Sequence, residues 1–300
     1  MINEKLDIIS PLTYIVNISY KTSIGSQGTE DGQFNLPANV KADEKYIFVT
    51  DAKNNRIEVF DKLDYSFVAK FGSQGTEDGQ FKFPEGIDID ENHIFVADSA
   101  NFRVQVFKKS DYSFVAKFGS QGTEDGQFNF PANVRVDDSK IYVADVVNNC
   151  IQVFDKNNFK FISKFGSQGS EDGQFNSPQG FYVDKTHIFV ADSDNDRIQV
   201  FLKENNSFVT KFGSIGAEDG LFNTPRGLVV DDNRIFIVDS SNQRIQVFDK
   251  NNFKFISKFG SQGTDNGQFM YPRGIDVSKD NLFVADVLNN RVQVLNVINS

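Results

Sequence analysis

The chain has 300 residues, 39% of them hydrophobic, so it is long enough to bury a large core as a single domain. Its formal net charge of −10 at pH 7 disfavours tight binding to nucleic acids, because contacts with phosphate dominate such affinities. We therefore expect one globular domain over residues 1–300, with partners other than nucleic acids.

The N-terminal residues do not resemble a targeting segment. Residues 1–16 mix charges among apolar positions and lack a basic start followed by an unbroken apolar run, so they make a poor signal peptide. No segment approaches the length of a membrane span. A single cysteine, Cys150, excludes an internal disulfide framework and is compatible with a reducing compartment. We expect a cytoplasmic monomer that does not attach to membranes.

A glycine-rich phrase, FGSQGTEDGQF, occurs at residues 71–81 and again without change at residues 118–128. Similar copies bring the starts to 24, 71, 118, 165, 212 and 259, so successive copies are 47 residues apart. A constant period of this size, without insertions, is typical of an architecture in which one supersecondary unit is copied. The sequence therefore predicts six equivalent structural units.

Each unit contains short segments with the patterns of β-strands. In the second unit these are GIDID at 86–90, HIFVADS at 93–99, RVQVF at 103–107 and YSFVAKF at 112–118. Turn-forming residues separate them, and no stretch has helical periodicity. Four short antiparallel strands in a repeat of this length are typical of a propeller blade. We predict an all-β fold, a six-bladed β-propeller with four antiparallel strands per blade.

The two ends of the chain are predicted to meet in one blade. The last copy ends after RVQVL at 291–295, without a fourth strand before Ser300. Residues 19–26, SYKTSIGS, match residues 66–73, SFVAKFGS. Residues 1–23 are therefore predicted to be a closing segment that supplies the outer strand of the last blade, which leaves no open seam in the ring.

The unit closely resembles the NHL repeat. The resemblance rests on a glycine-rich lead-in that ends in G-Q-F and on the landmarks P-x-G-I, I-x-V-A-D, N-x-R and I-Q-V-F, which recur over nearly the whole chain. NHL domains are known as six-bladed propellers. The resemblance therefore implies the same fold as the repeat period.

The repeated phrase is interpreted as structural. Asp-Gly forms turns, the glycines allow positive φ, and the closing phenylalanine is placed to pack between neighbouring blades. A phosphate cradle would need a following Gly-Lys-Ser/Thr, and Glu77 with Asp78 would repel phosphate. A second repeated pair, Asp98 with Arg103, is predicted to form an ion pair across a tight turn. In the third unit Cys150 replaces the arginine and leaves Asp145 without that partner.

Positions that differ between copies are the most informative about function. Strand order places the repeated phrase and the loop between the second and third strands on one face, here called the top face. Its variable apolar residues concentrate in blades one, two, three and six, which is typical of a partner site. The alternative is that these side chains merely pack beneath the loops. The predicted partner-binding residues are Phe83, Phe102, Phe130, Val147, Tyr271 and Leu288, with Arg226 and Arg273 orienting an acidic group of the ligand.

A calcium site at the channel mouth is one alternative. Asn39 and Asn133 stand where the other four blades have glycine, and both flank Glu85. Six-bladed lactonases resemble this layout in holding calcium with carboxylates and asparagines, although their sequence motifs are absent here. Asparagine also suits a left-handed backbone, which is the structural interpretation of the two positions. The NHL-like amidating lyases use channel histidines and zinc, whereas His93 and His187 fall in turns of the opposite face.

Three functions therefore compete. An interaction scaffold requires only a rigid disc with one variable face. RNA binding, known among NHL domains, would need a basic top face, whereas acidic pairs repeat around this rim. Catalysis lacks a convergent set of acid, base or metal ligands. The sequence predicts a non-catalytic scaffold that binds a protein or peptide and needs no cofactor. A metal-dependent hydrolase and an RNA-binding domain stay as the alternatives.

Overall fold

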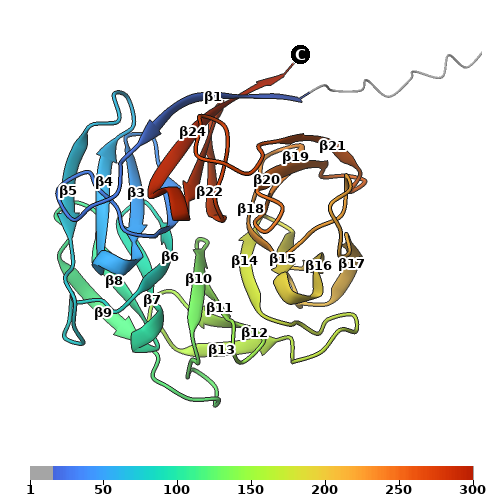
Figure 1. Ribbon diagram of the computed structural model, residues 1–300. Helices are drawn as coiled ribbons and strands as arrows, with labels where there is room; N and C mark the ends of the chain where they lie inside the picture. Colours follow the sequence, from blue (N-terminus) through green and yellow to red (C-terminus); the bar gives the residue numbers. More distant parts are fainter. Residues whose placement is uncertain (1–15, 300) are drawn as a thin grey trace, which may run out of the picture.

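The computed structural model describes residues 16–299, which form six four-stranded antiparallel sheets arranged around a central channel (Figure 1). The predicted all-β, six-bladed propeller is confirmed. Each sheet is one blade. The innermost strands are β2, β6, β10, β14, β18 and β22, because these six contact one another in a ring. In blades one to five the other strands follow outward in sequence order, whereas in blade six the outermost strand is β1. Residues 84–89, 93–98, 103–108 and 114–118 form the second blade, close to the segments expected from the sequence.

Each blade contains four strands that follow one another from the channel outward. Blade one is β2 (Pro37–Ala42), β3 (Tyr46–Asp51), β4 (Arg56–Asp61) and β5 (Phe67–Phe71), and blade two is β6 (Pro84–Ile89), β7 (His93–Asp98), β8 (Arg103–Lys108) and β9 (Phe114–Phe118). Blade three is β10 (Pro131–Val136), β11 (Lys140–Asp145), β12 (Cys150–Asp155) and β13 (Phe161–Phe165), and blade four is β14 (Pro178–Val183), β15 (His187–Asp192), β16 (Arg197–Leu202) and β17 (Phe208–Phe212). Blade five is β18 (Pro225–Val230), β19 (Arg234–Asp239), β20 (Arg244–Asp249) and β21 (Phe255–Phe259), and blade six is β22 (Pro272–Ser278), β23 (Asn281–Asp286), β24 (Arg291–Asn299) and β1 (Val16–Ile24). Short 3₁₀ turns η1 (Ala52–Asn54), η2 (Ser99–Asn101), η3 (Ser193–Asn195) and η4 (Val287–Asn289) follow the second strands of blades one, two, four and six.

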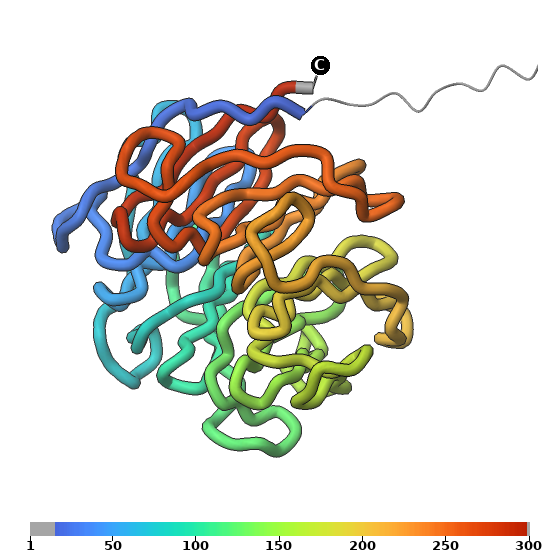
Figure 2. The backbone as a smooth tube through the Cα atoms, turned by 45° about the vertical axis from the view of Figure 1, so that its right-hand side comes forward, coloured from blue at the N-terminus to red at the C-terminus, as the bar shows by residue number. Residues whose placement is uncertain are grey.

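Blade six joins the two ends of the chain. Strand β1 pairs antiparallel with β24, from Val16 opposite Asn299 to Ile24 opposite Val292. Figure 2 shows the N-terminal and C-terminal segments running side by side at this blade. The predicted closure by the N-terminal segment is confirmed for β1, while residues 1–15 lie outside the described residues. Because β1 covers the edge of β24, that edge is not open to other chains.

Phenylalanines of the repeated phrase hold neighbouring blades together. Phe81, which closes the phrase before blade two, is fully buried, and its ring centroid lies 5.5 Å from that of Phe107 in the same blade. The same cluster contains Phe48 and Ile57 of blade one, so Phe81 packs at the junction of the two blades, as predicted. Truncating a buried phenylalanine of this kind costs about 3–5 kcal/mol.

Arginines attach the phrase to the top of five of the six blades; blade three has Cys150 instead. In blade two, Arg103 Nε donates to Asp98 Oδ2 at 2.8 Å, which confirms the predicted ion pair. The rest of the guanidinium donates to backbone carbonyl oxygens of Thr76, Glu77 and Gln80, all within the phrase. The phrase is therefore a structural loop, and three of its carbonyl oxygens accept hydrogen bonds from this one side chain. The equivalent Nε–Oδ2 distances are 2.9 Å for Arg56–Asp51, 2.7 Å for Arg197–Asp192, 2.7 Å for Arg244–Asp239 and 2.8 Å for Arg291–Asp286.

Candidate functional site

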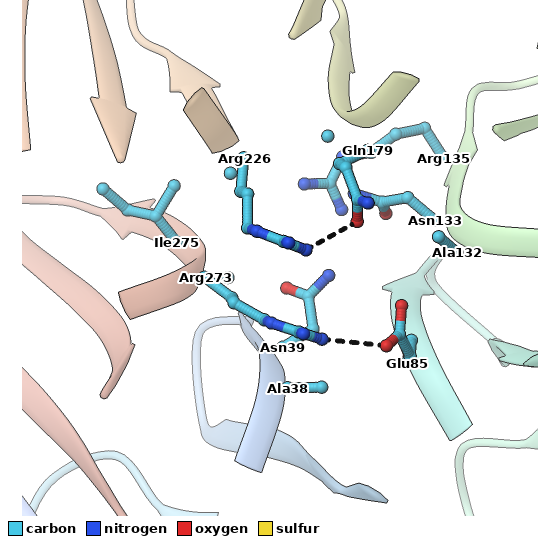
Figure 3. A pocket seen from close by; sticks show the side chains of 13 residues that line it. Ala38, Asn39, Glu85, Ala132, Asn133, Arg135, Gln179, Arg226, Arg273 and Ile275 are labelled. Atoms are coloured by element: carbon cyan, nitrogen blue, oxygen red, sulfur yellow. Dashed lines mark hydrogen bonds and ion pairs between the residues drawn. The ribbon is translucent and has the colours of Figure 1, made fainter. Parts of the chain in front are cut away.

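The innermost strands place one variable side chain per blade at the top of the channel. This residue directly follows the proline that begins each inner strand, and in an antiparallel blade that end faces the top loops. A cavity of about 30 Å³ opens there, enough for roughly one or two water molecules (Figure 3). We call it the channel mouth. The six residues at this position are Ala38, Glu85, Ala132, Gln179, Arg226 and Arg273, and all line the cavity.

Two arginines from adjacent blades lie beside each other in the channel mouth, and their guanidinium groups point across it (Figure 3). Arg273 Nη1 donates to Glu85 Oε1 at 2.9 Å on the far side. Arg226 Nη1 donates to Gln179 Oε1 at 3.0 Å, and its Nη2 donates to the hydroxyl of Tyr271 at 2.6 Å. The Tyr271 ring also contacts both guanidinium groups, with Cζ-to-centroid distances of 4.9 Å for Arg226 and 5.5 Å for Arg273. Tyr271 therefore braces the arginine pair from the side.

Burial shapes the electrostatics of this group. It lowers the pKa of Arg226, and the neighbouring charge of Arg273 adds to that effect. Burial also raises the pKa of Glu85, against the opposing pull of the two arginines. The Nε atoms of Arg226 and Arg273 are both buried and have no hydrogen-bond acceptor within the described residues. The channel mouth thus holds cationic donors that the protein itself does not fully satisfy.

The interpretation of Asn39 and Asn133 as left-handed residues is wrong. Neither has a positive φ. The glycines at this position in other blades are required by close packing instead, since a Cβ on Gly86 would lie 2.5 Å from the Cα of Asn133 and one on Gly180 would lie 1.9 Å from the carbonyl oxygen of Arg226.

The side chains weighed as calcium ligands have other partners. The Oδ1 atoms of Asn39 and Asn133 accept the backbone N–H groups of Val40 and Val134. The carboxylate of Glu85 faces Arg273, and a cation there would meet the positive charge of the arginine pair. Among residues 16–299, no three His, Cys, Asp or Glu side chains gather closely enough to hold a metal ion. The geometry of the channel mouth favours an anion over a cation.

A second, larger pocket of about 240 Å³ opens beside the channel mouth on the top face. Four of the predicted partner-binding residues meet in it although they come from blades two and six: Phe83, Tyr271, Arg273 and Leu288. Leu288 is 50% exposed, so its side chain is available to a ligand. We call this the apolar pocket; its lining is Leu36, Ala38, Phe83, Tyr271, Arg273, Val287 and Leu288.

The other predicted residues of blades two and three do not line this pocket. Val147 is 54% exposed, whereas Phe102 and Phe130 are half-buried. Phe102 stands at a left-handed position, φ 55°, that ends the turn after the second strand. In the other blades this residue is Asn, Asp or Gln. Its side-chain oxygen accepts a hydrogen bond from the backbone N–H of the residue that precedes the inner-strand proline of the next blade. Asn55, for example, accepts from the N–H of Phe83 at 2.9 Å. Phe102 cannot make that bond, so it departs from the other copies at a structural cost.

A charged group deeper in the channel was not predicted from the sequence. Lys41 Nζ lies 3.1 Å from Asp88 Oδ1 and 3.4 Å from Asp276 Oδ1, and both carboxylates are buried. Although burial opposes it, the charges of Asp276 and Asp88 raise the pKa of Lys41. All three residues occupy the fourth position after the inner-strand proline, where Arg135 and Tyr182 also stand. This position varies between the copies, as the position directly after the proline does, and that variation is the sequence signal for the charged group.

The two histidines lie far from the channel mouth. His93 and His187 begin β7 and β15, at the ends of the strands opposite Asp98 and Asp192, which lie at the top. Their predicted location on the opposite face is confirmed. Separately, within residues 16–299 no helix is long and apolar enough to cross a membrane.

Comparisons with protein families support the repeat interpretation. The NHL repeat family matches residues 81–107, 222–248 and 269–295. Each match begins at the phenylalanine that closes the phrase and ends in the third strand of the blade. A family described as a 6-bladed beta-propeller, DUF5128, matches residues 121–213. No curated protein shows a significant sequence match to the chain.

Several solved structures share the fold at low sequence identity. A protein of unknown function from Bacteroides thetaiotaomicron has a TM-score of 0.70 at 17% identity, over 94% of this chain and 76% of that chain. Hydrazine synthase from Kuenenia stuttgartiensis has a TM-score of 0.61 at 10% identity, over 91% and 98% respectively. BamB from Moraxella catarrhalis has a TM-score of 0.50 at 13% identity, over 86% and 71%. At such identities the similarity shows the fold alone.

Proposed function

We propose that this six-bladed β-propeller, which contains NHL repeats, is a non-catalytic scaffold that binds a protein or peptide segment on its top face. The observation that carries the proposal is the apolar pocket. Aromatic and aliphatic side chains from blades one, two and six surround about 240 Å³ of space, and one of them, Leu288, is 50% exposed. Pockets that receive an apolar anchor commonly concentrate binding energy in a few such side chains.

Charge complementarity indicates the chemistry of the partner. Arg273 lines both the apolar pocket and the channel mouth, and Arg226 lies next to it with neutral partners only. A ligand that fills the apolar pocket would therefore present its next group to a pair of guanidiniums. This supports a segment with an apolar side chain close to an acidic group.

The competing functions lack comparable support. The exposed top rim carries acidic residues in every copy of the phrase, such as Glu77 with Asp78, and these would repel a phosphate backbone. Hydrolysis would need an activated nucleophile or water at the channel mouth. The one carboxylate that lines the cavity, Glu85, is ion-paired with Arg273. The channel mouth is better suited to holding a charged group than to transferring a proton.

Selection from a phage-displayed library of random dodecapeptides on the immobilised protein tests the proposal. Selected peptides are resynthesised with a fluorescent label, and their affinities are measured by fluorescence polarisation. Phe83→Ala should weaken binding by about 1–3 kcal/mol, because the ring is lost from the pocket wall while the fold is kept.

Phe130→Ala provides a matched control, since Phe130 occupies the same repeat position in blade three but does not line the pocket. Normal affinity in Phe83→Ala, with a loss in Phe130→Ala, would place the site on another part of the face. Recovery of no peptide, together with submicromolar binding of RNA at physiological salt or turnover of a lactone, would refute the scaffold.

A further inference from the structure

The channel mouth contains more positive than negative charge. Arg135, Arg226 and Arg273 line it, and Glu85 is the one acidic side chain among its lining residues. Glu85 pairs with Arg273 at 2.9 Å. Arg226 donates to the neutral side chains of Gln179 and Tyr271, and Arg135 donates to backbone carbonyls. The charges of Glu85 and Asp194 act on Arg226 without a direct hydrogen bond. This excess of positive charge stands out in a protein whose net charge is −10.

The arginine pair also has unused hydrogen-bonding capacity. Both Nε atoms are buried without an acceptor, and leaving a buried donor unsatisfied is unfavourable. Two like charges are held side by side. Burial lowers the pKa of Arg226, and the charge of Arg273 lowers it further. An anion between the guanidiniums would relieve the repulsion and accept hydrogen bonds from both. Small residues leave room for it, since Ala38, Ala132 and Gly180 are part of the same wall.

We propose that the channel mouth is a carboxylate-binding site, and that it receives the acidic group of the segment whose apolar side chain occupies the adjoining apolar pocket. The carboxylate-binding site stands by itself, whereas the link to an apolar side chain of the same segment rests on the proposed function. Ala38 and Arg273 line both cavities, so one ligand reaches both.

A carboxylate fits the site better than a phosphate does. The channel mouth holds about 30 Å³, which suits a small planar group. Guanidinium and carboxylate match in a bidentate, planar geometry. Glu85 lies on the opposite wall, where its charge would repel a dianion more strongly than a monoanion. The site therefore selects for a single negative charge.

Hexanoate is the probe of choice, because it joins one carboxylate to a short apolar chain. Protein labelled with ¹⁵N-arginine is titrated with sodium hexanoate, and the Nε–H signals of Arg226 and Arg273 are followed by NMR. We expect both signals to shift and saturate, and hexanamide to bind at least tenfold more weakly. Equal binding of the acid and the amide, or no shift at either arginine, would overturn the proposal.

Matched variants separate the site from general electrostatic attraction. Arg226→Gln should abolish hexanoate binding, and Arg226→Lys should restore part of it. Lys53→Gln, which removes an exposed top-face cation outside both pockets, should change nothing. Melting curves of the variants check that each is folded. Inorganic phosphate that binds more tightly than acetate would refute the preference for a carboxylate.

Acetate distinguishes this proposal from the proposed function. If acetate still shifts the Arg226 signal while Phe83→Ala leaves the affinity of every selected peptide unchanged, the carboxylate site stands and apolar docking fails. If selected peptides depend on Phe83 but neither acetate nor hexanoate shifts either arginine, the scaffold stands and the carboxylate site fails. Selected peptides resynthesised as C-terminal amides, or with Glu and Asp changed to Gln and Asn, show whether the carboxylate comes from the terminus or from a side chain.

Discussion

Blades two and three contain the same loop but support it in different ways. In blade two, Arg103 joins Asp98 to three carbonyl oxygens of the phrase. In blade three the buried Cys150 takes that place, and Asp145 keeps only the donors supplied by Asn129 N–H, Asn148 and Gln152. Burial raises the pKa of the Cys150 thiol to about 12, and the charge of Asp145 adds to this, so the thiol stays protonated and unreactive.

The comparison shows that the phrase keeps its conformation without the arginine. Gly126 and Gly79 have the same φ of 81°, and Phe128 and Phe81 are both fully buried. The glycine conformations and the buried phenylalanine therefore suffice to shape the loop. The arginine adds stability to a loop whose shape is already determined, and blade three should be the more easily opened of the two.

The largest effect is expected from making blade two resemble blade three. Arg103→Cys removes four hydrogen bonds and leaves Asp98 with its charge less well compensated, which should destabilise the protein by about 3 kcal/mol. Denaturant unfolding measures the loss. A cost below about 1 kcal/mol would contradict the role assigned to the arginine.

The reverse change should stabilise the protein by a smaller amount. Cys150→Arg supplies donors to Asp145 and to the carbonyls of the third phrase, but the arginine also loses rotamer freedom, so we expect a gain of about 1–2 kcal/mol. Hydrogen exchange of the amides at residues 118–128 should slow more than exchange in the neighbouring blades. Faster exchange there would mean that the cysteine site has no room for the side chain.

Blade one contains another departure, which makes stability depend on pH. Where the other blades have glutamine, blade one has Glu58, and Glu58 Oε2 accepts the N–H of Gly32 at 3.1 Å. In blade two, Gln105 also donates to Gln80 O at 2.7 Å, which an ionised glutamate cannot do. Burial raises the pKa of Glu58 to about 7, opposed by Arg56.

A folded-state pKa above the ordinary value of 4.5 means that the contribution of Glu58 to stability is fully present below pH 4.5 and is lost as the pH rises through about 7. Glu58→Gln should therefore stabilise the protein by about 1–2 kcal/mol at pH 8 and by almost nothing at pH 4.5. Parallel unfolding curves of the two proteins between these pH values check the difference. A constant difference across the range would exclude the titration of Glu58 as its cause.

The smallest expected effect concerns the junction of blades two and three. Phe102→Asn should restore the hydrogen bond to the N–H of Phe130 and relieve a left-handed phenylalanine, a gain of about 1 kcal/mol. Thermal unfolding measures it, with Asn55→Phe at the junction of blades one and two as the opposite change. If Phe102→Asn stabilises the protein but weakens a selected peptide, Phe102 belongs to the binding surface as well.

Much of the fold could be predicted from the sequence because the same strand and turn signals recur in six copies. The period, the alternation within 86–90 and 103–107, and the partial last copy together determined the blade count and the closure by β1. The pairing of Asp98 with Arg103 was predictable too, since both recur at a spacing that suits a tight turn.

The candidate site is different, because it depends on which blades are neighbours across the ring. Arg273 and Glu85 are 188 residues apart and meet only when the ring closes. The apolar pocket likewise joins Phe83 to Leu288, but excludes Phe130, which looks equivalent in the sequence. The sequence also suggested left-handed backbones at Asn39 and Asn133, which the structure does not have. Glycine occurs at this position in other blades because neighbouring inner strands approach closely, as Gly86 does to Asn133. The sequence by itself determined the blades, since strand pairing and turns are local; only the tertiary structure decided which side chains converge on the channel, since that convergence is set by the closure of the ring.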